Sequence, residues 1–348
     1  MPRKIDSAHV FFRQYAARLP NLHDSAKQAQ SIVESVLANH RGNIHLITAR
    51  PKSLESAFWK VVRKSYTRPD EQLTDKIGVR VIAYYESDVD PIVKTLASEF
   101  EIDTKRSTDK REALDLRSFG YRSVHLIARL TGFRAASQDY AAMRGQWFEI
   151  QVRSILEHAW AEIEHEIVYK SGTTYPKELL RRFAAIAGTL ELIEKEFLDL
   201  RKERAQLIEN YRERYERGMD GRERLDTARL LGLLESEWPR NLSWRRAETS
   251  GKPFPAKLEE RCVIALSKAG ITQANKLSRI FRARPFQRAL RSFASAEVLS
   301  RENISHLAIV LLAVATRDRK IFRDYFPSMA DSASISSALT RPKKKRQH

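Results

Sequence analysis

The spacing of apolar residues predicts a mixed α/β N-terminal part. Apolar residues recur at helical spacing over residues 6–39, and Pro20-Asn21 interrupts the pattern, so two short helices are expected there. Segments rich in β-branched and aromatic residues predict strands at 44–48, 77–85, 122–129 and 147–153. Helices are predicted between and after these strands, at 53–64, from Asp90 to about Phe100, and at 155–169.

After Pro176 the pattern is typical of helices only. A long helical stretch reaches about residue 217, and Gly218 and Gly221 mark a linker. Further helices are predicted at 227–237, 258–269, 273–283, 285–293 and 304–322. The expected fold is α+β, a mixed β-sheet flanked by helices followed by an all-α C-terminal domain. The expected divisions are a mixed domain at 1–175, a helical connector at 176–221, a basic all-α extension at 222–340 and a basic tail at 341–348.

Composition narrows the class of protein. The single cysteine, Cys262, excludes a disulfide framework and a thiolate zinc site, and it fits a reducing compartment. The first six residues lack the apolar core of a secretory signal. The longest apolar run, Leu307 to Ala315, is too short to cross a bilayer. We therefore expect a cytoplasmic protein without a membrane partner.

The positive charge is concentrated in the C-terminal part. The chain has 62 Lys and Arg against 44 Asp and Glu, a net charge of +18, and 26 of the basic but only 12 of the acidic residues lie from Arg222 onward. Between Arg261 and Ala296 there are eight basic residues and no acidic one. This asymmetry predicts salt-dependent attraction to a polyanion such as nucleic acid. A solvated basic surface that aids solubility is the alternative.

Two predicted strands carry polar residues on one face. Because side chains alternate along a strand, Ser123 and His125 share a face with Tyr121, and Gln151 and Arg153 share one with Glu149. Such triplets on an otherwise apolar sheet indicate an open site. The alternative is an antiparallel sheet with one ordinary solvated face.

A phosphate-binding segment is predicted where the strand at 44–48 leads into the helix at 53–64. Arg50, Lys52 and the helix-capping Ser53 would meet an anion together with backbone N–H groups, and Lys60 follows along the helix. The alternative is a capped helix with a basic exposed face. Asp75 precedes the next strand, which carries Arg80, and these residue types together suit transfer of a phosphoryl-type group with Mg²⁺ bound by carboxylates.

These residues also resemble a known family. The segments Arg50-Pro51-Lys52-Ser53, Asp75 to Arg80, Gly120 to His125, and Glu149 through Trp160 to Lys170 are similar, in order and spacing, to the RelA/SpoT alarmone synthetase domain over about residues 40–175. The resemblance implies a nucleotidyltransferase-like mixed sheet. It also implies transfer of the β,γ-pyrophosphate of ATP to the 3′-hydroxyl of GDP or GTP, with Mg²⁺, to make (p)ppGpp.

The resemblance assigns a role to each matching residue. Arg50 and Arg80 would sandwich the adenine, and Lys52, Ser53 and Lys60 would hold the ATP phosphates. Asp75 would bind Mg²⁺, and Glu149 would activate the 3′-hydroxyl or complete the metal site. The acceptor would contact four residues, namely Tyr121, His125, Gln151 and His158.

The sequence does not identify which substrate accepts the pyrophosphate. Arg117-Ser118-Phe119 stands where the family usually has a Lys and an Asn before the Gly-Tyr pair, and no hydrolase half is recognisable. One alternative is a toxic synthetase that pyrophosphorylates the 3′ end of tRNA. A second is a nonenzymatic protein that binds RNA or the ribosome. A homo-oligomer, a regulator and an antitoxin are compatible with the sequence, which identifies none of them.

Overall fold

The computed structural model describes residues 2–38, 44–109, 123–164, 166–167, 176–218, 221–237, 258–295 and 306–325. The chain divides into two compact units, Met1–Asp199 and Leu200–His348. The division falls within the long helix that the sequence predicts from Pro176. No described helix is both long and apolar enough to cross a membrane.

The N-terminal unit is built on a mixed sheet of the order β1-β2-β6-β5-β3, with β4 paired to β5. β2 and β6 run parallel, and the other neighbours are antiparallel. The strands are β1 (Ile44–Pro51), β2 (Ile77–Ala83), β3 (Glu101–Ile102), β4 (Thr108–Asp109), β5 (Val124–Arg129) and β6 (Phe148–Ser154).

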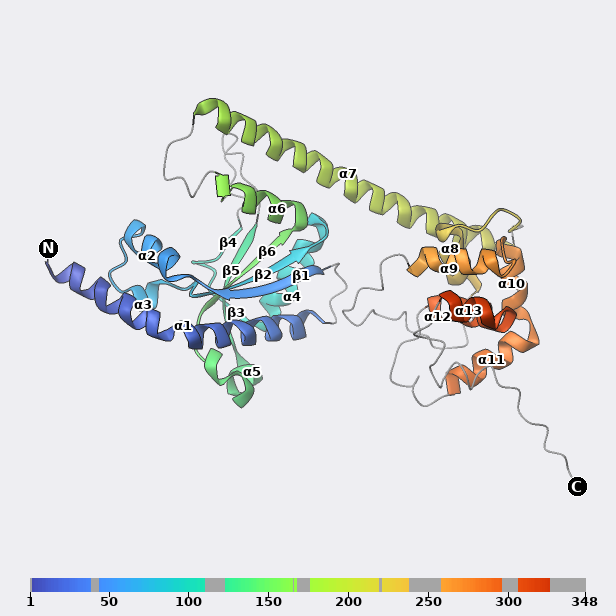
Figure 1. The fold of residues 1–348 in the computed structure, drawn as a ribbon, viewed down its shortest axis with the longest axis horizontal. Helices are drawn as coiled ribbons and strands as arrows, with labels where there is room; N and C mark the ends of the chain where they lie inside the picture. Colours follow the sequence, from blue (N-terminus) through green and yellow to red (C-terminus); the bar gives the residue numbers. More distant parts are fainter. Residues whose placement is uncertain are drawn as a thin grey trace, which may run out of the picture. The chain divides into compact units, whose positions relative to one another are not determined.

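Helices lie on both faces of this sheet (Figure 1). The helices of the unit are α1 (Pro2–Leu37), α2 (Leu54–Arg63), α3 (Pro69–Gln72), η1 (Glu86–Asp88), α4 (Val89–Glu99), α5 (Gly132–Ala136), η2 (Gln138–Met143), α6 (Ile155–Glu164) and the first part of α7 (Lys177–Glu216). α1 and α4 pack on one face, where alternate strand residues such as Val79, Ile150 and Val152 are buried. α6 lies on the other face, which carries the polar residues of β2 and β6. The predicted α+β fold is confirmed.

The prediction of two helices over residues 6–39 is wrong, because α1 is one helix with Pro20 inside it. Proline removes one backbone hydrogen bond from a helix interior. On both sides of Pro20 the same helix face is buried in the core, through Phe11 and Tyr15 before it and Leu22 and Ala26 after it. This packing stabilises the helix enough to offset the lost bond.

The described part of the C-terminal unit consists of the end of α7 and further helices. These are α8 (Thr227–Glu237), α9 (Leu258–Lys268), α10 (Ala274–Arg282), α11 (Arg284–Ser295), α12 (His306–Arg317) and α13 (Arg319–Tyr325), packed around their own core. The prediction of a single helix over residues 304–322 is wrong, because this segment forms the two helices α12 and α13. It is divided at Asp318, whose Oδ1 accepts hydrogen bonds from the backbone N–H groups of Lys320 and Ile321 and so caps a new helix.

Candidate active site

A hollow of about 150 Å³ opens on the polar face of the sheet, where β1, β2 and β6 lie side by side. Seven residues that the sequence predicted for the site line it, namely Arg50, Lys52, Ser53, Asp75, Arg80, Glu149 and Gln151. Pro51, Ser56 and Gly78 complete the lining. The hollow therefore brings two carboxylates and three cations from separate parts of the sequence to one place.

The backbone of Lys52 is fixed from two directions. Its N–H donates to the carbonyl of Lys76 (2.8 Å), and its own carbonyl accepts from the hydroxyl of Tyr15 on α1 (2.8 Å). Next to it, the Oγ of Ser53 accepts from the N–H of Ser56 (3.2 Å) and caps α2 as predicted. The segment between β1 and α2 is thus held rigidly at the rim of the hollow.

Asp75 lies beneath this segment and is only 6% exposed. Its Oδ2 is 2.6 Å from the Nζ of Lys60 and 2.9 Å from the Nζ of Lys52. Its Oδ1 is buried and has no hydrogen-bond partner among the described residues. Since a buried carboxylate oxygen normally has a partner, this atom is available to a ligand.

Glu149 is held through both of its oxygens. Oε1 is 2.8 Å from the Nδ1 of His125 on β5, and Oε2 accepts from the Nε2 of Gln151 (2.7 Å). His125 Nε2 in turn lies 2.7 Å from the Oγ of Ser123. Burial alone would raise the pKa of Glu149, but the hydrogen bond and charge of His125, with Gln151 and Lys60, lower it to about 2. Glu149 is therefore ionised and oriented throughout the neutral range.

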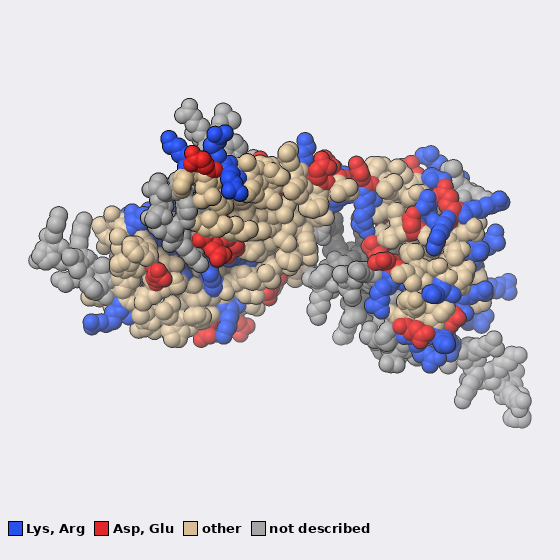
Figure 2. Space-filling model, turned by 45° about the horizontal axis from the view of Figure 1, so that its top comes forward, with Lys and Arg blue, Asp and Glu red and all other residues tan. Residues whose placement is uncertain are grey.

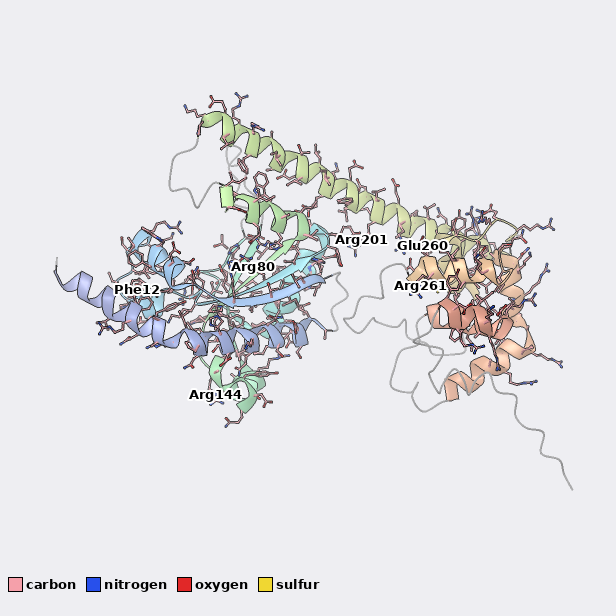
Figure 3. All side chains as sticks on the ribbon, in the orientation of Figure 1. Phe12, Arg80, Arg144, Arg201, Glu260 and Arg261 are labelled. Carbon is pink, nitrogen blue, oxygen red and sulfur yellow. The ribbon has the colours of Figure 1, made fainter. Side chains whose placement is uncertain are left out.

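Arg80 of β2, labelled on the sheet in Figure 3, pairs with Glu162 of α6 (2.8 Å). Glu162 also lies 3.5 Å from Arg153 and 3.9 Å from His158. Burial, and then the positive charge of Arg80, lower the pKa of Arg153 to about 10. Burial and the charge of Arg153 likewise lower the pKa of His158. One glutamate on α6 thus lies among three basic side chains beside the hollow and offsets part of their charge.

The remaining predicted residues fall in three places. Lys60 and His125 do not line the hollow but contact its two carboxylates. His158 lies beside Arg153 and Glu162 on α6, outside the lining. Tyr121 and the preceding acceptor loop lie outside the described residues. The roles assigned to all of these residues stay predictions.

Sequence reasoning did not assign Ser56, Gly78 or Tyr15 to the site. Gly78 could have been found, because a glycine inside a strand often marks open space or a close approach. A Cβ built on Gly78 meets no atom within 4 Å. The contacts of Tyr15 and Glu162 join residues far apart in the sequence, and no local pattern indicates them.

The carboxylates of Asp75 and Glu149 fit a divalent cation whose other coordination positions are filled by oxygens of a substrate. No three or more His, Cys, Asp or Glu side chains of the described residues are grouped to hold a metal. Two carboxylates, one with a free buried oxygen, are what Mg²⁺ uses when it also binds nucleotide phosphates.

Comparison with known proteins identifies this part of the chain. A family model described as the region found in RelA and SpoT proteins matches residues 49–174. The GTP pyrophosphokinase YwaC of Bacillus subtilis is 29% identical over 159 residues, which is 44% of this chain and 72% of that protein. The GTP pyrophosphokinase YjbM of the same species is 24% identical over 162 residues, which is 46% and 73% of the two chains.

The crystal structure of small alarmone synthetase 1 from Bacillus subtilis, bound to its product pppGpp, has a TM-score of 0.46 and 22% identity. The structural match covers 56% of this chain and 99% of the synthetase chain. The family match begins one residue before Arg50 and ends after the segment that follows α6, so it includes every residue of the hollow. Residues 49–174, which hold the hollow, therefore match the region found in RelA and SpoT proteins.

Proposed function

We propose that the N-terminal unit transfers the β,γ-pyrophosphate of ATP to the 3′-hydroxyl of GDP or GTP. The observation that carries the proposal is the convergence of Asp75 and Glu149 on one hollow that is also lined by Arg50, Lys52 and Arg80. Carboxylates beside an array of cations are the groups that phosphoryl-type transfer requires, because the chemistry depends on positioning and charge neutralisation. The matched relatives are named GTP pyrophosphokinases.

Bound Mg²⁺ would be held by Asp75 Oδ1 and Glu149, and it would neutralise charge on the transferred group. Lys52 and Lys60 now neutralise Asp75 from within 3 Å. Both lysines stay close enough to bind triphosphate oxygens when the nucleotide enters. The cations Arg50 and Lys52, with the hydroxyl of Ser53, then orient the phosphate chain against the sheet.

In this proposal Glu149 accepts the proton of the attacking hydroxyl. The 3′-oxygen forms a bond to the β-phosphorus of ATP while the bond from that phosphorus to the α-bridging oxygen breaks, so AMP leaves. The hydroxyl proton passes to Glu149. His125 and Gln151 hold the carboxylate in a fixed orientation for this transfer, through bonds of 2.8 and 2.7 Å.

A second acceptor is supported by a separate observation, the basic charge of the C-terminal unit. The same transfer chemistry could act on the 3′ end of tRNA, which the excess of cations after Arg222 would attract. A nonenzymatic RNA-binding role is the weaker candidate, because the acidic and basic groups of the hollow are all in place.

An acceptor screen tests these functions. The full chain is incubated with Mg²⁺ and γ-labelled ATP, and GDP, GTP, adenine nucleotides and bulk tRNA are supplied separately. We expect AMP and a 3′-pyrophosphorylated guanine nucleotide in equal amounts. Label on tRNA alone would show that tRNA, and not GDP or GTP, is the acceptor. Absence of AMP with every acceptor contradicts the enzymatic proposal.

A further inference from the structure

Helices α10 and α11 form a rigid corner of the C-terminal unit. Leu277 and Phe281 of α10 and Phe286 of α11 are buried in its core. The rings of Phe281 and Phe286 lie 5.2 Å apart, and the side chain of Gln287 donates to the carbonyl of Phe281 (2.5 Å). Because the apolar sides face inward, the polar sides of both helices must face solvent.

The outward side of this corner is basic. Five exposed cations alternate with the buried residues, and together they are called the α10–α11 face: Lys276, Arg279, Arg282, Arg284 and Arg288. Their spacing of three or four residues within each helix places them on one side of it. Several blue side chains are visible at the outer margin of the C-terminal unit in Figure 2.

Several arginines elsewhere in the unit pair with acidic side chains. Arg204 pairs with Glu259 (2.7 Å), and Arg214 and Arg229 both pair with Glu223 (3.2 and 2.8 Å). Four members of the α10–α11 face make no ion pair or side-chain hydrogen bond with any residue that the structure describes: Lys276, Arg279, Arg284 and Arg288. No residue that the structure describes therefore neutralises the charge of these four side chains.

We propose that the α10–α11 face binds the phosphodiester backbone of a nucleic acid. Guanidinium groups match phosphate oxygens with paired hydrogen bonds, and they predominate on this face. A row of unneutralised cations on a rigid element positions a backbone without reading its sequence. The binding depends on the C-terminal unit and does not require the proposed transferase activity.

The same observations disfavour two other polyanions. A helix that binds an anionic membrane inserts apolar side chains beside its cations. The large apolar residues that the structure describes in α10 and α11 are instead buried in the core or, as Ile280, packed against it. Protein interfaces usually add Trp or Tyr anchors beside their arginines. None of the described side chains of the α10–α11 face provides one.

Fluorescence anisotropy of the full chain with a labelled 20-nucleotide RNA and a 20-base-pair DNA duplex, from 50 to 200 mM KCl, tests the proposal. The logarithm of the association constant should fall linearly with the logarithm of salt, by about 0.7 to 0.9 per phosphate contacted. The quadruple variant K276Q/R279Q/R284Q/R288Q should lower that slope by about 3 and weaken binding at least tenfold at 100 mM KCl. Comparison of the two probes shows whether RNA or DNA is preferred.

The control variant R317Q/R319Q/K320Q/R323Q removes the same charge and the same residue types from α12 and α13 of the same unit. It should bind within about threefold of the wild type. Should the quadruple variant fail to fold, the double variants K276Q/R279Q and R284Q/R288Q should each show about half of its effect on the slope.

Equal weakening by the control variant would overturn the assignment, because binding would then follow net charge alone. Salt-independent binding, or none to either probe, would also overturn it. So would binding confined to vesicles that contain phosphatidylserine.

Discussion

The Nδ1 of His125 lies 2.8 Å from Oε1 of Glu149, across the antiparallel pair of β5 and β6. Glu149 is a hydrogen-bond acceptor when ionised, so Nδ1 of His125 must carry the proton of this bond. The opposite ring nitrogen then faces the hydroxyl of Ser123. This chain orients the proposed base through groups that lie beside the hollow rather than in it.

The His125–Glu149 bond should make stability depend on pH. The folded pKa of Glu149, about 2, lies below its usual value of 4.5, so its stabilising contribution is present above about pH 4.5 and is lost as pH falls toward 2. The difference corresponds to about 3 kcal/mol. Urea unfolding between pH 3 and 7 should show that H125A loses most of this contribution. The control H23A changes an exposed histidine on α1 and should keep the wild-type pH dependence.

Removing one of the two lysines at Asp75 should have less effect than removing the carboxylate. In K60M the carboxylate keeps Lys52 at 2.9 Å, so we expect a fall in kcat/KM of about tenfold. D75N removes the negative charge that both ammonium groups share and replaces one of the two carboxylate oxygens by an NH2 group, which cannot bind a metal ion. Its kcat/KM should fall about 10²-fold or more. Similar losses in both variants would mean that Asp75 acts only through Lys60.

Glu162 should act as a positioning residue for Arg80. E162Q removes the charge that holds the guanidinium at 2.8 Å, so Arg80 becomes mobile at the edge of the hollow. We expect the KM for ATP to rise about three- to tenfold with kcat within about twofold, since nucleotide binding loses an oriented cation. E164Q, on the same helix, is the matched control and should leave both constants unchanged. A loss confined to kcat would contradict a role in binding.

Gly78 should tolerate a side chain for folding but not for activity. An added Cβ meets no atom within 4 Å, so G78A should unfold at or slightly above the wild-type temperature. The same side chain enters the hollow beside Glu149, its partner in the β2–β6 register. Activity should fall at least tenfold in G78A and further in G78V. G188A, an open position on α7, should remain fully active.

The sequence allowed prediction of the parts of the fold that depend on local patterns. The alternation of polar residues along β6 correctly placed Glu149 and Gln151 on one face, and their side chains are hydrogen-bonded. Ser53 was predicted as the cap of α2, which the structure confirms. These features follow from the period of a strand and from the chemistry of a helix end.

Features set by distant contacts could not be predicted in this way. α1 continues through Pro20 because its buried face packs on the sheet, and that packing is not visible in the local sequence. The interruption at Asp318 depends on one side chain that bonds to the backbone. Glu162 reaches Arg80 over 82 positions, and only the sheet and α6 together bring the two side chains into contact.

The central claim is that Asp75 and Glu149 serve one transfer reaction in one hollow. It is tested most directly by quantifying AMP and 3′-pyrophosphorylated guanine nucleotide formed by the wild type, D75N and E149Q under single-turnover conditions. The wild type should form both products in equal amounts, and each variant should be at least about 10²-fold slower while still binding ATP. Wild-type rates in both variants, or a wild type that forms neither product with any acceptor, would contradict the claim.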